Sequence, residues 1–164
     1  MFSQAVSNAM NNQIQAELYS AYLYLAMSAH FEAENKPGFA RWMQLQSNEE
    51  LEHAMKFYGF IHDRGGRVEL QAIQQPQTTF TTPLAIFEQA YAHEQKVTAL
   101  INSIYDVARQ ENDYASQTFL NWFVDEQVEE EKNASQIVDT LKLMGDSPAA
   151  LFMLDRQLGA RGAG

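Results

Sequence analysis

Apolar residues recur at alternating spacings of three and four along four long segments of the chain, which is the period of one face of an α-helix. The segments are rich in Ala, Leu, Met, Glu and Gln, all good helix formers, and the prolines fall between the segments or at their starts. The pattern predicts an all-α fold with long helices at 4–33, 38–64, 83–111 and 114–144. A short fifth helix is expected at 148–158.

The lengths of the connections predict how these helices are arranged. Tight turns join the first helix to the second and the third to the fourth, so each pair should form an antiparallel hairpin. The connection from Gly65 to Thr82 is longer: extended, it reaches roughly 59 Å, whereas the second helix is about 40 Å long. It can therefore run the whole length of the bundle. We expect one domain at 1–164: a four-helix bundle with one long crossover at 4–144, then the short helix at 148–158.

Each apolar face is interrupted near the middle of its helix by ionisable or amide side chains. These are Glu17, Glu50 with His53, Glu94, and Gln127 with Glu130. Because helix midpoints share one layer in such a bundle, we expect a polar layer between apolar layers. Four carboxylates in an apolar core cannot all be ionised without compensation. Protonation and cationic side chains are alternatives, but no Lys or Arg lies on these faces, so metal ions are the natural counter-charge.

The spacing of these groups fits a paired-metal site. Glu50-x-x-His53 puts a carboxylate and an imidazole one turn apart, and the other helices add single carboxylates. Ligands rich in oxygen with one nitrogen suit iron or manganese. His53 alone would more often be a satisfied core histidine, but the coincidence of six groups in one layer favours metal. Tyr24 lies two turns from Glu17, as a core side chain whose hydroxyl can reach a ligand carboxylate.

A second group of acids lies beside the polar layer. Glu49 precedes Glu50, while Glu126 and Glu129 lie next to the apolar face of the fourth helix. With Glu130 they predict a third, more exposed cation site, and a solvated acidic face is the alternative. The other histidines are expected at the surface or at helix ends: His30, His62 and His93.

Net charge and composition limit the classes of partner that the protein can be expected to bind. The net charge is −10, from 21 acidic and 11 basic residues, which argues against nucleic acid and suits cations, although it also favours solubility. There is no cysteine, which excludes disulfides and Cys-ligated sites and fits a reducing cytosol. Met1 to Gln13 shows no secretory signal, and no apolar stretch approaches the roughly 20 residues that span a bilayer. We expect a cytoplasmic protein with no membrane partner.

With these residues in place, the chain resembles a bacterial or archaeal non-haem ferritin over almost its whole length. The likeness is carried by the segments at 17–27, 49–54, 66–68 and 122–131. The resemblance implies two iron ligand sets that share Glu50 as a bridge: Glu17, Glu50 and His53, then Glu50, Glu94 and Glu130. It places Gln127 and Tyr24 beside the pair and matches Glu49, Glu126, Glu129 and Glu130 to a third iron site.

The resemblance also implies an activity. Ferritins are ferroxidases, which oxidise Fe(II) with O₂ or H₂O₂ and store ferric mineral inside a hollow homo-oligomeric shell of twenty-four subunits. A haem-binding bacterioferritin fits poorly, because its second Glu-x-x-His is replaced here by Gln127 and Glu130, and its haem-ligating Met by Leu51. We therefore expect no haem.

The rival to storage is a soluble di-iron oxidase or peroxidase that detoxifies iron and peroxide without storing a mineral. The segment at 149–154 argues against it, because this segment is apolar on every side and should be buried in an oligomer contact. The Gly/Ala/Arg tail at 159–164 is expected to fray.

Overall fold

The computed structural model describes residues 2–162, which form five helices and no strand in that range. The helices are α1 (Gln4–Ala33), α2 (Pro37–Asp63), α3 (Pro83–Gln110), α4 (Tyr114–Met144) and α5 (Pro148–Gly159). The predicted all-α fold is confirmed, and each predicted helix boundary is matched to within one residue. None of these helices is both long enough and apolar enough to cross a bilayer.

The helices begin where short polar side chains can satisfy free backbone N–H groups. Ser3 accepts from the N–H of Val6, and Thr82 accepts from the N–H of Ala85. Asp113 accepts from the N–H of Ser116 at the start of α4 and also pairs with Arg64 at 2.9 Å. Helix α2 differs, because its own N-cap residue, Lys36, makes no side-chain cap bond.

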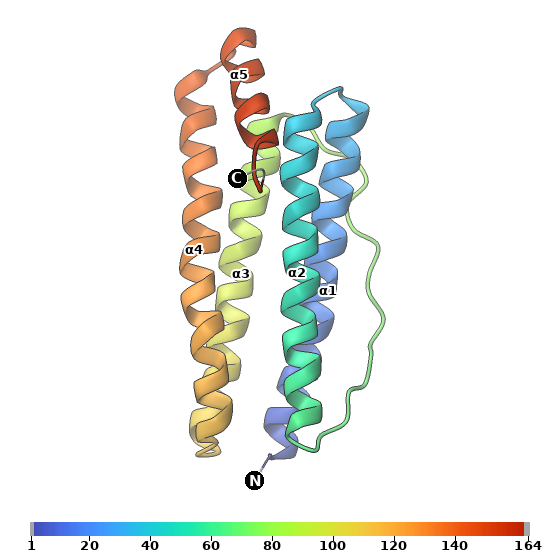
Figure 1. Ribbon diagram of the computed structural model, residues 1–164, viewed down its shortest axis with the longest axis vertical. Helices are drawn as coiled ribbons and strands as arrows, with labels where there is room; N and C mark the ends of the chain where they lie inside the picture. Colours follow the sequence, from blue (N-terminus) through green and yellow to red (C-terminus); the bar gives the residue numbers. More distant parts are fainter. Residues whose placement is uncertain (1, 163–164) are drawn as a thin grey trace.

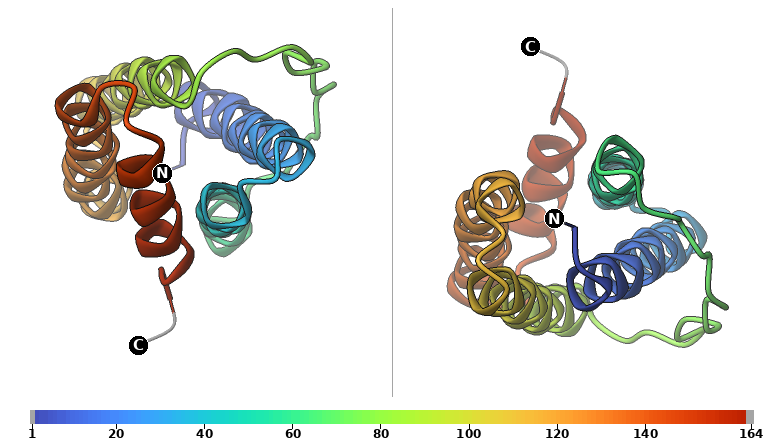
Figure 2. Two further views of the ribbon diagram at one scale, coloured as in Figure 1. Left: turned by 90° about the horizontal axis from the view of Figure 1, so that it is seen from above. Right: turned by 90° about the horizontal axis from the view of Figure 1, so that it is seen from below.

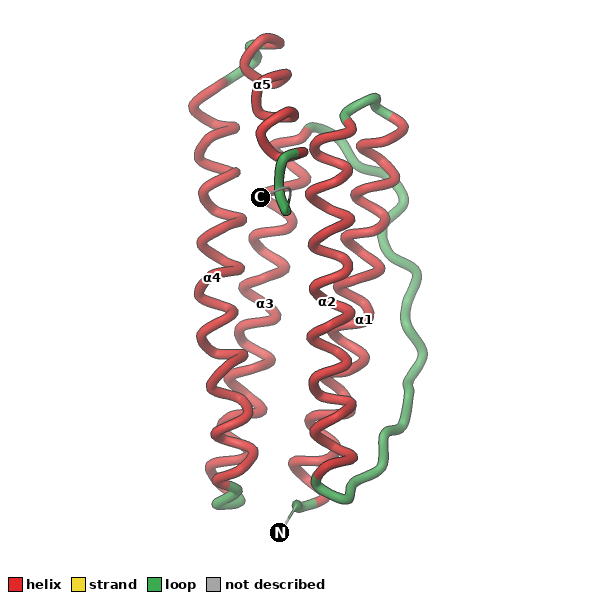
Figure 3. Tube along the Cα trace, viewed as in Figure 1, coloured by secondary structure: helices red, strands yellow, loops and turns green. Residues whose placement is uncertain are grey.

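The long crossover, residues 64–82, runs along the whole length of the bundle beside α1, so α2 and α3 are parallel, as predicted (Figure 1). It has no regular secondary structure (Figure 3). Side chains of α1 hold it: Asn11 Nδ2 donates to Arg67 O at 3.0 Å, and Asn11 Oδ1 accepts from the N–H of Glu69 at 2.8 Å. The crossover is therefore an ordered part of the bundle surface.

Two apolar clusters fill the bundle. One holds Phe31, Phe39 and Phe87 and receives Leu154 and Leu158 from α5, which crosses one end of the bundle (Figure 2). The other cluster holds residues from the opposite halves of all four long helices, among them Met10, Phe57, Ile101 and Phe123. Between these clusters lie the midpoints of the four helices, where the sequence predicts a polar layer.

Candidate metal centre

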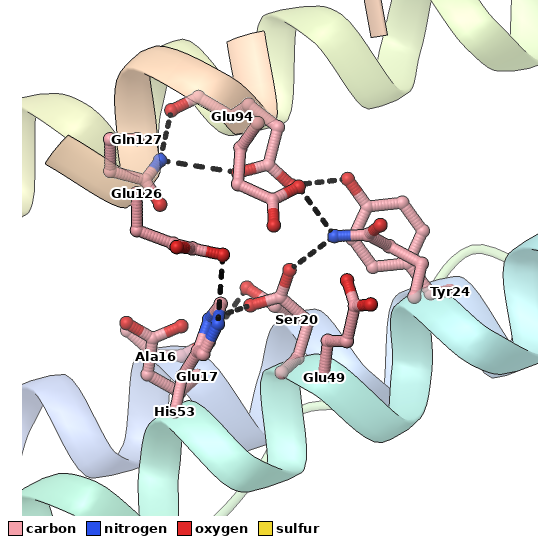
Figure 4. A network of polar contacts seen from close by, with 12 residues as sticks. Ala16, Glu17, Ser20, Tyr24, Glu49, His53, Glu94, Glu126 and Gln127 are labelled. Atoms are coloured by element: carbon pink, nitrogen blue, oxygen red, sulfur yellow. Dashed lines mark hydrogen bonds and ion pairs between the residues drawn. The ribbon is translucent and has the colours of Figure 1, made fainter. Parts of the chain in front are cut away.

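The six polar groups predicted to share one layer are all buried. Glu17, Glu50, His53, Glu94, Gln127 and Glu130 are each no more than 5% exposed. They come from all four long helices, and in Figure 4 Glu94 and Gln127 face Glu17 and His53 across the interior. The structure thus brings together groups that are more than one hundred positions apart at the extremes of the sequence.

Their ligand atoms form two compact groupings that share one carboxylate. In the first, atoms of Glu17, Glu50 and His53 lie within 4.8 Å of one another, and in the second, atoms of Glu50, Glu94 and Glu130 do. His53 Nδ1 lies 3.4 Å from Glu50 Oε2. Each grouping offers oxygen ligands, with a single nitrogen in the first, and Glu50 can bridge two cations.

Burial and mutual repulsion make this layer hold protons more tightly than exposed carboxylates would. Burial, followed by the charge of Glu50, raises the pKa of Glu17 well above its usual value and that of Glu94 to about 8. Burial and the charges of Glu94 and Glu50 raise the pKa of Glu130 to about 8. These groups are therefore neutral over much of the pH range in which an exposed Glu is ionised.

Glu50 and His53 behave as an ion pair inside this layer. Burial by itself raises the pKa of Glu50, but the hydrogen bond and positive charge of His53 outweigh it, so this pKa is lowered. Burial by itself lowers the pKa of His53, but Glu50 outweighs it and the pKa is raised. Glu50 thus carries a negative charge within the layer, where the neighbouring carboxyls hold their protons.

Within residues 2–162, one buried oxygen of the layer has no hydrogen-bond partner, and it belongs to a predicted ligand. Glu17 Oε2 is inaccessible to solvent and accepts no hydrogen bond, while Gln13 Nε2 donates to the other oxygen, Oε1, at 2.8 Å. Once Glu17 gives up its proton, a buried carboxylate oxygen without a partner is costly, and a cation beside it would satisfy it. The residues present therefore fit a metal pair.

Two buried amides support the carboxylates, and neither was among the site residues expected from the sequence. Gln13 donates to Glu17, and Gln46 Nε2 donates to Glu50 Oε1 at 2.9 Å and to Glu130 Oε2 at 2.7 Å. Both amides lie four residues before the Glu on the same helix. That i, i+4 spacing is the signal that could have identified them.

Tyr24 and Gln127 both contact Glu94. The hydroxyl of Tyr24 donates to Glu94 Oε1, and burial followed by the charge of Glu94 raises the pKa of Tyr24. Gln127 Nε2 lies 3.2 Å from Glu94 Oε2 and 3.2 Å from Thr98 Oγ1. The two neutral groups hold this carboxylate in place without adding charge to the layer.

The second group of acids predicted from the sequence, Glu49, Glu126 and Glu129 (the outer acids), is only partly brought together by the fold. Glu126 joins His53 and Glu130 in a third grouping, with 3.9 Å between His53 Nε2 and Glu126 Oε1. Glu129 is exposed and lies outside the groupings found among residues 2–162. Glu49 also lies outside them and pairs instead with Arg161, whose Nη2 is 2.7 Å from Glu49 Oε2.

Two expectations about single residues need correction. The tail is not frayed at Arg161, which bonds α2, and the predicted fraying of residues 163–164 lies outside the described residues. His93 is half-buried rather than free at the surface: its Nε2 lies 2.7 Å from Ser20 Oγ, and burial lowers its pKa. Its partner is on another helix, which its sequence neighbours did not reveal. His30 and His62 do lie in the last turns of α1 and α2, as predicted.

A four-helix bundle with one long crossover and a buried layer of carboxylates and histidine defines a class, that of paired-metal carboxylate proteins. The model of the ferritin-like domain matches residues 7–144, and the chain belongs to the ferritin-like family.

Among its relatives is a bacterial non-heme ferritin of Bacteroides fragilis (strain 638R), 46% identical over 98% of this chain and 100% of that protein. Another is a bacterial non-heme ferritin of Staphylococcus aureus (strain USA300), 38% identical over 98% of this chain and 97% of that protein. An open pore ferritin from the hyperthermophilic archaeon Archaeoglobus fulgidus matches with a TM-score of 0.97 and 46% identity, over 98% of this chain and 99% of that one. The resemblance to non-haem ferritins inferred from the sequence is confirmed.

Proposed function

We propose that this chain is an iron-storage ferroxidase, which oxidises Fe(II) at a paired site inside the bundle and deposits the product as a ferric mineral. The observation that carries the proposal is the pair of groupings that share Glu50 in a buried layer. Glu17, Glu50 and His53 hold the first ion, and Glu50, Glu94 and Glu130 hold the second.

The pairing of two ions suits a two-electron oxidant. Two Fe(II) ions give up one electron each, so one O₂ takes up two electrons and two protons to become H₂O₂, or one H₂O₂ takes up the same to become two waters. Carboxylate ligands stabilise the Fe(III) product, because hard anionic oxygen suits the higher charge. Proton-holding Glu94 and Glu130 lose their protons when cations enter, since metal ligands must be deprotonated.

Gln127 gives the site a way to release its product. It lies beside Glu94 as a neutral amide, whereas another carboxylate there would bind Fe(III) more tightly. The outer acids Glu49, Glu126 and Glu129, with Glu130, form a third site on the side where Glu129 reaches solvent. Product leaving the pair would pass these acids.

Storage requires an assembly, and α5 supports one. Phe152 and Met153 are 62% and 71% exposed on a helix whose other face is buried against the bundle. Exposed apolar side chains of this size favour contact with further copies of the chain. We propose a homo-oligomeric shell of twenty-four subunits in the cytoplasm, with iron and O₂ or H₂O₂ as its small partners.

The test of the activity is the initial rate of aerobic Fe(II) oxidation, followed by oxygen uptake. Glu50→Gln removes the shared ligand, and we expect the rate to fall by at least about 10–100-fold, the loss that follows even from removing a side chain that only supports a ligand. Glu52→Gln is the matched control, because Glu52 makes the same charge change on the exposed side of the same helix. A wild-type rate equal to that in buffer, or equal rates in the two variants, would refute the paired site.

Storage is tested separately by size-exclusion chromatography with light scattering, before and after aerobic loading. A large particle that retains iron supports the shell. Rapid oxidation by a small species that releases its iron would instead identify an oxidase or peroxidase without storage.

A further inference from the structure

The chain that follows α5 lies against α2 beside the outer acids, and one residue of it is firmly held. Arg161 Nη2 lies 2.7 Å from Glu49 Oε2 and 3.0 Å from Gln46 Oε1, and Nη1 lies 3.3 Å from Trp42 O. Its guanidinium is 4.5 Å from the centre of the Trp42 ring. Residues 42, 46 and 49 follow one another along one face of α2, so Arg161 contacts residues spread over about two turns of that face.

The packing of α5 against α2 positions Arg161 beside Glu49. Asp155 Oδ1 accepts from the N–H groups of Gly38 and Phe39, each at 3.0 Å, and so caps α2, which lacks a cap of its own. Gly159 packs so closely that an added Cβ would lie 3.0 Å from the Cα of Gly38. These contacts fix α5 at the first turn of α2 and direct the following residues along it.

Arg161 is also connected to the inner ligands through one amide. A guanidinium can only donate, so it must face Gln46 Oε1, which leaves Gln46 Nε2 to bond Glu50 and Glu130. Gln46 is 1% exposed, so no solvent competes for its groups. Arg161 therefore pairs directly with the outer acid Glu49 and reaches the inner ligands only through Gln46.

We propose that Arg161 is a tethered counter-ion of the outer site: it pairs with Glu49 Oε2 while no metal is bound, and a cation that takes this oxygen as a ligand must displace it. This inference rests on the proposed third site at Glu49, Glu126, Glu129 and Glu130. The bonded oxygen of Glu49 cannot serve a guanidinium at 2.7 Å and a metal ion together without placing two cations side by side. Arg161 thus weakens the third ion, whose ligand it bonds directly, more than the inner pair, which it contacts only through Gln46, and so the inner pair fills first.

The experiment is an anaerobic equilibrium titration of metal-free protein with Fe(II), at physiological salt where charges beyond about 8 Å are largely screened. In Arg161→Gln, we expect the third ion to bind about two- to fivefold more tightly than in wild type, the effect of removing a partly exposed ion pair. Arg156→Gln is the matched control: it removes the same charge from α5, but Arg156 is exposed and stacks on Phe152. It should leave the third ion unchanged.

A double-mutant cycle separates competition at Glu49 from a general loss of positive charge. In a Glu49→Gln background, Arg161→Gln should no longer change the binding of the third ion. If it still does so to the same extent, or if wild type and Arg161→Gln bind this ion equally, the tethered counter-ion is refuted while the third site stands.

The remaining outcomes distinguish this inference from the proposed function. A third ion that is lost in Arg161→Gln would make Arg161 a support of the site rather than a competitor, and would overturn the inference. Two bound ions and no third in every variant would refute the inference and the third site but leave the paired ferroxidase site intact. A third ion seen only in Arg161→Gln would support the inference in its strongest form.

Discussion

Glu94→Gln should stabilise the metal-free protein while it damages the second ion position. The variant replaces a buried carboxyl by a neutral amide of the same shape, whose oxygen can still accept from Tyr24. Its NH₂ takes the place of the oxygen that accepts from Gln127, so the Gln127 amide must turn to present its own oxygen. The pKa of Glu94 is raised from its usual 4.5 to about 8, a difference of about 3.5. At about 1.4 kcal/mol per unit, the upper limit of the gain is about 5 kcal/mol. In the wild type, Glu130 can take up a proton and so reduce its repulsion with Glu94. The cost of Glu94 is then smaller, and we expect the variant to gain about 1–4 kcal/mol in the free energy of unfolding.

The size of this effect depends on pH. Below pH 4.5 Glu94 is protonated in both the folded and the unfolded chain, and it costs the folded state nothing. As the pH rises towards 8, the unfolded chain loses this proton and the folded chain keeps it, so the stability of the wild type falls. Gln cannot titrate. The advantage of Glu94→Gln should therefore be small near pH 5 and largest above pH 8.

The assay is denaturant unfolding of metal-free wild type and variant at one fixed protein concentration, at pH 5 and at pH 8.5. Glu88→Gln is the control, since Glu88 lies on the exposed side of the same helix and should change stability by no more than about 0.5 kcal/mol. Glu94→Leu tests the hydrogen bond: it also removes the charge but leaves the buried Tyr24 hydroxyl without its acceptor, which costs about 1–3 kcal/mol relative to Gln.

The reasoning would be refuted by a gain that is the same at both pH values, or by no gain at pH 8.5. Either result would mean that Glu94 is not a proton-holding group of the empty layer. The predicted damage to the second ion position is measured by the initial rate of Fe(II) oxidation in the same two proteins. If Glu94→Gln oxidises Fe(II) at the wild-type rate, Glu94 is not a ligand.

Three further outcomes are expected. Protein purified from cells supplied with haem should show no stoichiometric Soret absorbance, because Leu51 cannot ligate iron; a Soret band at one haem per chain or per pair would contradict this. A chain that ends at Ser147 should keep α1–α4 folded by far-ultraviolet circular dichroism but lose its assembled size, because α5 carries exposed Phe152 and Met153; an unchanged particle would show that α5 is dispensable. Asp155→Ala should lower the free energy of unfolding by about 1 kcal/mol through loss of the α2 cap, and an unchanged unfolding midpoint would show that solvent caps α2 equally well.

Features of the fold could be predicted from the sequence where they depend on neighbouring residues or on a repeated pattern. Helix bounds followed from periodicity, Pro and caps such as Thr82, and the level of the polar layer followed from helix midpoints. Contacts between distant segments could not be predicted in this way. Asp155 caps Gly38 across 117 positions, and His93 meets Ser20 across 73.

The tail shows a different limit. Gly, Ala and Arg in residues 159–162 carry no periodic pattern, and flexible composition ordinarily predicts disorder. What orders Arg161 is the placement of α5, which depends on packing of Leu154 and Leu158 into the core. A residue whose position depends on tertiary docking has no local signal to detect.

The connectivity of the bundle also sets an order of assembly for the polar layer. Helices α1 and α2 form an antiparallel hairpin joined by a short turn, and short-range hairpins form early because they lose little loop entropy. This hairpin already carries the complete first grouping, Glu17, Glu50 and His53. The second grouping is completed only when the hairpin of α3 and α4 docks across the long crossover. We therefore expect like-charge repulsion to act late in folding, at the docking step, and a cation bound to the first hairpin to speed that step.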